Sequence, residues 1–173
     1  GAVMMNAGTR DVEIARCVSR VEALTTPGRS RVFSREECAF GYRRSVFHGS
    51  GWFILGAELK LVRGDSSKSL KTIDAFLAER ERKYHPDVPS AGSVFKRPPG
   101  GYAGRLIEAA GCKGMRVGDA VVADWHANFI VNAGRASAKD IMELISAIRR
   151  RVYDTSGVYL ELEQIHLSPT LSR

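Results

Sequence analysis

The sequence has few cysteines, no long apolar run and no pattern of a signal peptide. Its 173 residues include three cysteines, Cys17, Cys38 and Cys112, and no two of them are close in sequence. This spacing suits neither a disulfide framework nor a zinc site, so we expect reduced thiols in a cytoplasmic protein. The longest apolar run, residues 51–57, is strand-sized and far below the roughly 20 residues that a membrane helix needs. The first residues show no basic leader before an apolar core, so a signal peptide is not expected.

Nucleotide-binding loops and metal-binding patterns are also missing. The opening segment, residues 1–8, has small residues where backbone could approach a ligand closely, but it is neither a dinucleotide fingerprint nor a P-loop. The four histidines are not spaced as metal ligands, so we expect no bound metal. His126 remains open as a base, a ligand or a core histidine. The serine elbow of hydrolases is absent as well.

Positive charge predominates in the sequence. The formal net charge is +7, and adjacent arginines occur at residues 43–44 and 149–151. A basic balance favours an anionic partner, which could be nucleic acid, a membrane surface or a phosphorylated small molecule. No nucleic-acid-binding motif accompanies the clusters, so charge alone leaves an anionic ligand and simple solubility both open.

The first half of the chain predicts strands followed by a helix. Two half-apolar runs flank residues 26–28, which is a hairpin signal, and residues 52–62 follow as a strand with Leu59 and Leu61 facing inward. A helix is expected to begin near Asp65 or Ser66, with one apolar face formed by Leu70, Ile73, Phe76 and Leu77. Pro86 and Pro89 forbid its continuation, so we place a domain boundary near Lys83.

The second half predicts strands, a helix and a last strand. Residues 120–123 and 128–132 are candidate strands. A helix is expected to begin at Ser137 with a capping box that involves Asp140, and to end at Gly157. Its apolar stripe consists of Ile141, Leu144, Ile145, Ile148 and Val152. Residues 158–165 alternate as a strand, which completes an order of elements typical of an α+β fold.

Three segments of the chain carry side chains suited to chemistry. Ser93 follows a glycine and precedes Lys96 and Arg97; spacing alone favours a turn serine, because a hydroxyl needs a base, a cation or a dry setting to act. Arg43 lies beside an aromatic residue and could bind carboxylate or phosphate, although taken alone the motif is more typical of a solvated strand end. Glu161 and Glu163 share a strand face, where they are either acid–base groups or the solvated side of an edge strand.

Taken together, these motifs resemble a known family. The segments GAVMMNAG, FGYRRSVF, PSAGSVFKRPPG with AGRLIEAAGCKG, HANFIVN and LELEQI occur in the order found in UDP-N-acetylenolpyruvoylglucosamine reductases, also called UDP-N-acetylmuramate dehydrogenases. The resemblance covers residues 1 to about 167. It implies an oxidoreductase of peptidoglycan biosynthesis that uses FAD, takes its electrons from NADPH and reduces UDP-N-acetylglucosamine enolpyruvate.

The resemblance also implies roles for individual residues. Ser93 matches the general acid that protonates carbon, Arg43 matches the arginine that holds the substrate carboxylate and stabilises the enolate, and Glu163 matches the terminal carboxylate. These residue types suit the chemistry, since a fixed arginine lowers the energy of an enolate and a weak acid must be held close to protonate carbon. The remaining expected site residues are Tyr42, Lys96, Arg97 and Asn128 for substrate, and Asn6, Ala7 and Gly8 for the flavin.

The resemblance implies two domains and two departures from the family. Residues 1–83 match a remnant of an antiparallel-sheet flavin-binding subdomain, and residues 84–173 match a small α+β substrate-binding domain. The family's glycine-rich pyrophosphate loop has no counterpart, so we expect a fragment that binds FAD weakly or not at all and is inactive alone. Trp125 replaces a residue that is usually polar, and Arg97 stands where many members have asparagine.

Alternatives to the reductase remain at this point. The chain could be a non-catalytic module that binds a UDP-sugar or another anion. Nucleic-acid binding is a third possibility that depends only on the charge. We expect a monomer in the cytoplasm with a small-molecule partner and with neither nucleic acid nor membrane as partner.

Overall fold

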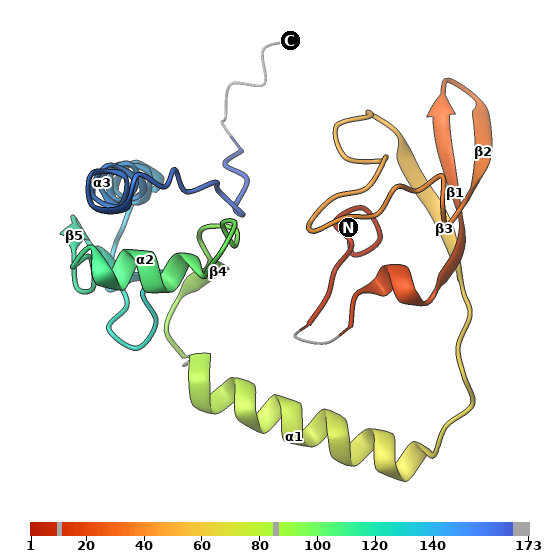
Figure 1. Cartoon of the computed structure of the whole chain (residues 1–173), viewed down its shortest axis with the longest axis horizontal. Coiled ribbons are helices and arrows are strands. Elements are labelled where there is room, and N and C mark those ends of the chain that lie inside the picture. Colours follow the sequence, from red (N-terminus) through yellow and green to blue (C-terminus); the bar gives the residue numbers. More distant parts are fainter. Residues whose placement is uncertain (10–11, 85–86, 168–173) are drawn as a thin grey trace. The chain divides into compact units, whose positions relative to one another are not determined.

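The computed structural model describes residues 1–9, 12–84 and 87–167. It divides into two compact units, Gly1–Ser66 and Ser67–Arg173, whose helices and strands are shown in Figure 1. Both units contain antiparallel sheets together with helices, which confirms the α+β class. The predicted boundary near Lys83 lies inside the second unit and stays a prediction. No helix in the described ranges is both long and apolar enough to cross a bilayer.

The first unit is built on a three-stranded antiparallel sheet. After the short 3-10 helix η1 (Ile14–Arg16) come β1 (Val18–Thr26), β2 (Arg29–Ser34) and β3 (Phe53–Leu59), in the sheet order β2-β1-β3. The predicted hairpin is confirmed, since Thr26 pairs with Arg29 across a turn in which Gly28 has a φ of 78°. A small core packs behind the sheet and consists of Val18, Val21, Ala23, Phe33, Cys38 and Phe47.

Strand β3 lies at the edge of this sheet and is largely uncovered. The prediction that Leu59 and Leu61 face inward is wrong, because their exposed fractions are 45% and 72%. Leu61 lies beyond the end of β3, and Phe53 at its start is 71% exposed. The reason is size: the small core of this unit covers residues of β1 and β2 but leaves most of β3 to solvent.

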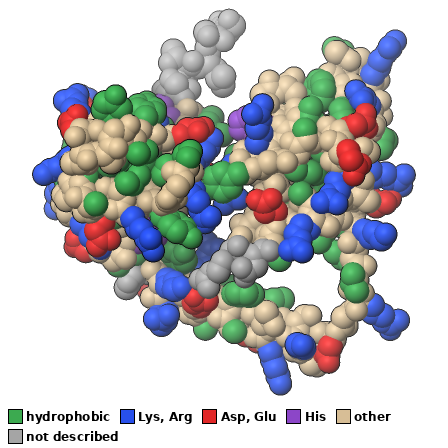
Figure 2. Space-filling view, in the orientation of Figure 1, with side chains coloured by type: hydrophobic (Ala, Val, Ile, Leu, Met, Phe, Trp, Pro, Cys, Tyr) green, Lys and Arg blue, Asp and Glu red, His purple; other side chains and the backbone are tan. Residues whose placement is uncertain are grey.

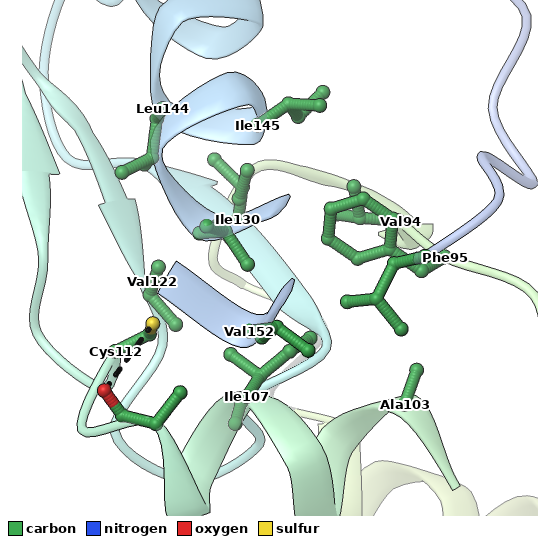
Figure 3. Packing of buried hydrophobic residues seen from close by; sticks show 14 of the residues in the cluster. Val94, Phe95, Ala103, Ile107, Cys112, Val122, Ile130, Leu144, Ile145 and Val152 are labelled. Atoms are coloured by element: carbon green, nitrogen blue, oxygen red, sulfur yellow. Dashed lines mark hydrogen bonds between the residues drawn. The ribbon is translucent and has the colours of Figure 1, made fainter. Parts of the chain in front are cut away.

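The second unit has a four-stranded antiparallel sheet with the order β4-β7-β6-β5. Its strands are β4 (Ser90–Ser93), β5 (Arg116–Val117), β6 (Ala120–Val122) and β7 (Phe129–Asn132), and the last two confirm the predicted strands. Helices α2 (Ala103–Ala109) and α3 (Ala138–Ser156) supply the other side of the main core. Figure 3 shows how side chains from these elements point toward one another; among them are Ile107, Val122, Ile130, Leu144, Ile145 and Val152.

Helix α3 forms as its sequence predicts. Its capping box is complete, since the Ser137 hydroxyl accepts from Asp140 N at 3.1 Å and the Asp140 carboxylate accepts from Ser137 N at 2.7 Å. Gly157 ends the helix in the left-handed conformation, with a φ of 69°. Four positions of the predicted stripe are fully buried, namely Leu144, Ile145, Ile148 and Val152.

Helix α1 (Ser66–Tyr84) also forms as predicted, but it buries no residue. Its apolar positions are all more than half exposed, with fractions of 60% for Leu70, 51% for Ile73, 57% for Phe76 and 53% for Leu77. In Figure 2 hydrophobic side chains are visible on the surface of this helix, whereas Lys and Arg side chains are spread over both units among acidic ones. The helix therefore has an amphipathic pattern without a covered face.

The predicted last strand is wrong in its extent. Residues 158–165 form no strand, and only one bridge, from Phe95 to Leu162, links them to the sheet. The predicted alternation of burial holds at Tyr159, which is 67% exposed, and at Leu160, which is fully buried, but it ends at Glu163, which is half-buried. Pairing is short because Gly92, with a φ of 80°, bends the partner segment at one end and prolines follow Arg97 at the other.

Candidate functional site

A short extended segment, residues 93–96, carries the predicted catalytic serine in the second unit. It runs between β7 and the C-terminal residues 161–164. On one side Val94 N donates to Asn128 O at 2.9 Å, and on the other Glu163 N donates to Val94 O, also at 2.9 Å. The backbone next to Ser93 is therefore fixed from two directions.

Ser93 and Glu163 are brought together by this arrangement. Ser93 is the last residue of β4 and is exposed, while Glu163 is half-buried and hydrogen-bonded through its backbone to the residue after the serine. Gln164 adds a contact, since its Nε2 donates to Gly92 O at 3.4 Å. Gly92 has a positive φ, which glycine adopts without strain, and this bend presents the serine at the end of the strand.

Asn128 holds the segment in place. It is only 7% exposed, its Oδ1 accepts from Phe95 N at 3.0 Å, and its Nδ2 donates to Phe95 O at 2.9 Å. A buried amide that pairs with both backbone groups of one residue replaces a rung of the sheet. The geometry gives Asn128 a positioning role beside the serine, and direct contact with substrate stays a prediction.

The two predicted substrate cations lie just past the serine. Lys96 is partly buried, its ammonium forms an ion pair with the Glu161 carboxylate, and its backbone N donates to Glu161 O at 2.8 Å. Arg97 is exposed, and its guanidinium carbon lies 4.6 Å from the centre of the Tyr102 ring. Both cations therefore follow Ser93 on backbone that is tied to the Glu163 segment.

Arg43 and Tyr42 belong to the first unit. They lie in a tight turn in which Gly41 N donates to Arg44 O at 3.0 Å and Arg44 N donates to Gly41 O at 3.1 Å. Arg43 has a φ of 53°, and its guanidinium carbon lies 5.3 Å from the centre of the Tyr42 ring. A left-handed conformation is costly for a residue other than glycine, and such strain gathers at functional sites. This observation favours a specific task for Arg43.

The predicted flavin-binding residues lie beside that turn. Asn6 is buried and has a φ of 45°; its Nδ2 donates to Gly41 O at 3.0 Å and to Glu13 Oε2 at 2.9 Å. Its Oδ1 accepts from Ala15 N at 3.1 Å. The Asn6 side chain thus joins the opening segment to the turn that carries Tyr42 and Arg43.

This segment fits a flavin only in part. The backbone N–H groups of Asn6 and Ala7 already donate to Val3 O and Ala2 O, at 3.1 and 2.8 Å. At Gly8 a Cβ would lie 2.8 Å from Glu13 Cγ, so glycine is required by packing within the unit. A ligand could approach the backbone at the exposed Ala7, because its side chain is small. Neither of these two N–H groups is free to bind a phosphate, however.

Sequence reasoning missed an aromatic cluster next to the serine segment. The Phe129 ring centre lies 5.4 Å from that of Tyr84, and 4.9 Å from those of both Trp125 and His126. His126 Nδ1 accepts from Asn128 N at 3.2 Å, and burial lowers the pKa of its imidazole. The half-buried His126 supports the backbone at Asn128 through this hydrogen bond, which gives it a positioning role. The spacing of aromatics in residues 125–129 was the signal that could have identified it.

Among residues 1–9, 12–84 and 87–167, no group of three or more His, Cys, Asp and Glu side chains could hold a metal ion.

Comparisons with known proteins agree on one family. A family model described as UDP-N-acetylenolpyruvoylglucosamine reductase, C-terminal domain, matches residues 83–167. The UDP-N-acetylenolpyruvoylglucosamine reductases of Moorella thermoacetica and Alkaliphilus oremlandii are 47% and 44% identical over 163 residues, which are 94% of this chain and 54% of each relative. A crystal structure of UDP-N-acetylenolpyruvylglucosamine reductase from Thermus caldophilus is similar with a TM-score of 0.78 and 42% identity, over 95% of this chain and 58% of that one. The chain thus spans about half the length of the curated relatives it matches.

Proposed function

Since the chain belongs to the UDP-N-acetylenolpyruvoylglucosamine reductase family, we propose that it carries the substrate-binding part of such a reductase. The proposed substrate is UDP-N-acetylglucosamine enolpyruvate, and the product is UDP-N-acetylmuramate for peptidoglycan in the cytoplasm. The observation that carries the proposal is the segment of residues 93–96, which is fixed between Asn128 and Glu163 so that the serine is exposed.

The proposed chemistry divides between the two units. In this activity FAD, reduced by NADPH, supplies the hydride. Arg43 then holds the substrate carboxylate and stabilises the enolate, because a fixed guanidinium lowers the energy of an anion as it forms. Ser93 donates its hydroxyl proton to the enolate carbon, and Glu163 orients that proton. Lys96 and Arg97 bind the anionic part of the substrate.

We propose residues 84–173 as the substrate-binding domain and residues 1–83 as part of the flavin-binding domain. The family match at residues 83–167 supports the first assignment. The hydrogen bond from Asn6 to Gly41, in the turn that carries Arg43, supports the second, since it joins the expected flavin segment to that turn.

Calorimetric titration of the chain with UDP-N-acetylglucosamine enolpyruvate tests the proposal. We expect binding, about tenfold weaker in Lys96→Gln because a charge-assisted hydrogen bond is lost. Ser93→Ala should bind within about twofold of the unchanged chain, because its hydroxyl acts in the reaction and not in holding the substrate. Lys139→Gln, an exposed lysine of α3, is the matched control. A folded sample that releases no heat, or a Lys96→Gln variant that binds normally, would contradict the proposal.

A second candidate is a module that binds the UDP-sugar without reducing it. It is favoured by the commitment of the Asn6 and Ala7 N–H groups to Val3 and Ala2. Because the chain alone is expected to be inactive, oxidation of NADPH is measured with FAD, substrate and the remaining part of the Moorella thermoacetica reductase added. Binding without oxidation then favours the module, and formation of UDP-N-acetylmuramate favours the reductase.

A further inference from the structure

Two arginines of the second unit share one aromatic ring. The guanidinium carbon of Arg97 lies 4.6 Å from the centre of the Tyr102 ring, and that of Arg105 lies 5.4 Å from it. A cation over an aromatic face is attracted to the ring, and one ring can interact with two cations because it has two faces. Both charges therefore lie within roughly 10 Å of each other.

The backbone builds this arrangement from a tight reversal. Lys96 N is fixed on Glu161 O, and Pro98 and Pro99 then restrict the chain to a narrow range of φ. Gly100 has a φ of 78° and Gly101 N donates to Pro98 O at 3.3 Å, so the chain turns back toward Arg97.

Tyr102 stands at the end of the reversal. It immediately precedes α2, and Arg105 N donates to Tyr102 O at 3.1 Å in the first turn of the helix. The ring thus lies near one arginine that precedes the reversal and one that belongs to α2. Arg97 and Arg105 are both exposed, and Tyr102 is 52% exposed, so a ligand in solvent can reach this cluster.

The nearby carboxylates do not neutralise Arg105. Glu108, one turn further along α2, pairs with Lys113 at 2.6 Å, and Glu161 pairs with Lys96. Among the described residues Arg105 has no ion pair with a carboxylate. Two guanidiniums that share one ring suit an anion that has several oxygens on two centres.

We propose that Arg105 binds the diphosphate of the UDP-sugar together with Arg97, and that Tyr102 is the positioning residue that holds the pair. This inference rests on the proposed function, and it adds two residues, Tyr102 and Arg105, to the substrate site. The planar forks each take one phosphate, while the ring limits the orientations that both side chains sample before the ligand arrives.

Titration calorimetry of the full chain with two ligands, UDP-N-acetylglucosamine enolpyruvate and inorganic diphosphate, tests the inference. Arg105→Gln should weaken both ligands by about tenfold and reduce the salt dependence of binding, because one cation is lost. Tyr102→Leu should weaken both by about fivefold with the charge unchanged, and Tyr102→Phe should restore affinity to within about twofold because it keeps the ring. Arg150→Gln, an exposed arginine of α3, is the matched control.

The outcomes separate the inference from the proposed function. If both ligands bind the unchanged chain and Arg105→Gln alike, the inference is wrong while the function stands. The inference is also wrong if Tyr102→Phe binds both ligands as weakly as Tyr102→Leu does. The aromatic ring would then not be the feature that positions the two arginines. If the variants weaken diphosphate but the UDP-sugar binds no better than diphosphate, the anion site stands and the proposed function is wrong. An unchanged chain that binds neither ligand overturns both.

Discussion

Helices α1 and α3 have the same length, 19 residues, and both have an amphipathic sequence, yet their surroundings are opposite. Helix α3 buries Leu144, Ile145, Ile148 and Val152 in the main core, while α1 buries nothing. Periodicity predicts that a helix forms and which face is apolar, but it carries no information on whether another element covers that face. The comparison separates the local causes of a helix from the tertiary ones.

Local features differ between the two helices as well. Helix α3 has a complete capping box and a left-handed glycine at its end. Helix α1 has no acidic residue in its first turn, although Arg82 and Lys83 in its last turn suit the helix dipole and Lys83 pairs with Glu79. Each such ion pair on a helix surface stabilises the helix by only roughly 0.2–0.5 kcal/mol. Burial should therefore dominate any difference in how the two helices respond to mutation.

The largest effect is expected for Leu144→Ala. The side chain is fully buried between α3 and the sheet, so its truncation should lower the free energy of unfolding by about 2–5 kcal/mol. Leu77→Ala in α1 is the matched control, and it should change the same quantity by less than about 0.5 kcal/mol. Urea denaturation of both variants measures the difference. Equal losses would show that α1 is as well covered as α3.

A smaller effect is expected for Ser137→Ala, which removes the cap of α3. The free energy of unfolding should fall by about 0.5–2 kcal/mol at neutral pH. The hydrogen bonds from Ser137 lower the pKa of Asp140, so this stabilisation is present above the unfolded pKa and is lost as pH falls through the lower folded value. Denaturation at pH 7 and at acidic pH checks the loss. Ser146→Ala, a serine that bonds only its own helix at Met142 O, should show no such pH dependence.

The smallest effect is expected for Phe76→Gln. Its ring is 57% exposed on the apolar face of α1, so the free energy of unfolding should change by no more than about 0.5 kcal/mol. Lys71→Gln on the same helix is the control for a change in surface polarity. Thermal unfolding followed by circular dichroism gives the measurement, and a loss above about 1 kcal/mol would show that another surface covers this face in solution.

Much of the fold could be predicted from the sequence where local chemistry decides it. The turn at Gly28 and the cap at Ser137 depend on their own residues, and both formed as predicted. The exposure of Leu59 could not be predicted from the sequence, because it depends on which other elements cover β3. The prediction of the last strand failed for a related reason. Its alternation of burial was correct at its start, but its partner segment is interrupted at Gly92 and Pro98.

The candidate site divides in the same way. Family motifs predicted Ser93 and Glu163, and the structure brings their backbones together. Tyr102 could not be assigned from spacing, because a shared ring arises only when a loop reverses. The spacing of aromatics in residues 125–129 could have indicated a cluster, but not the hydrogen bond by which His126 supports Asn128 N. Sequence patterns identify groups that act on a ligand more readily than groups that act on each other.

The amide of Asn128 also has a consequence for the chemical ageing of the protein. Asparagine deamidates when the backbone nitrogen of the next residue attacks the side-chain carbonyl, and here Phe129 N is engaged with His126 O at 3.0 Å. Conversion to aspartate would replace the Nδ2 donor by an oxygen that faces Phe95 O, so two acceptors would meet. The hydrogen bond that closes the 126–129 turn therefore also protects the amide from a reaction that would release the serine segment.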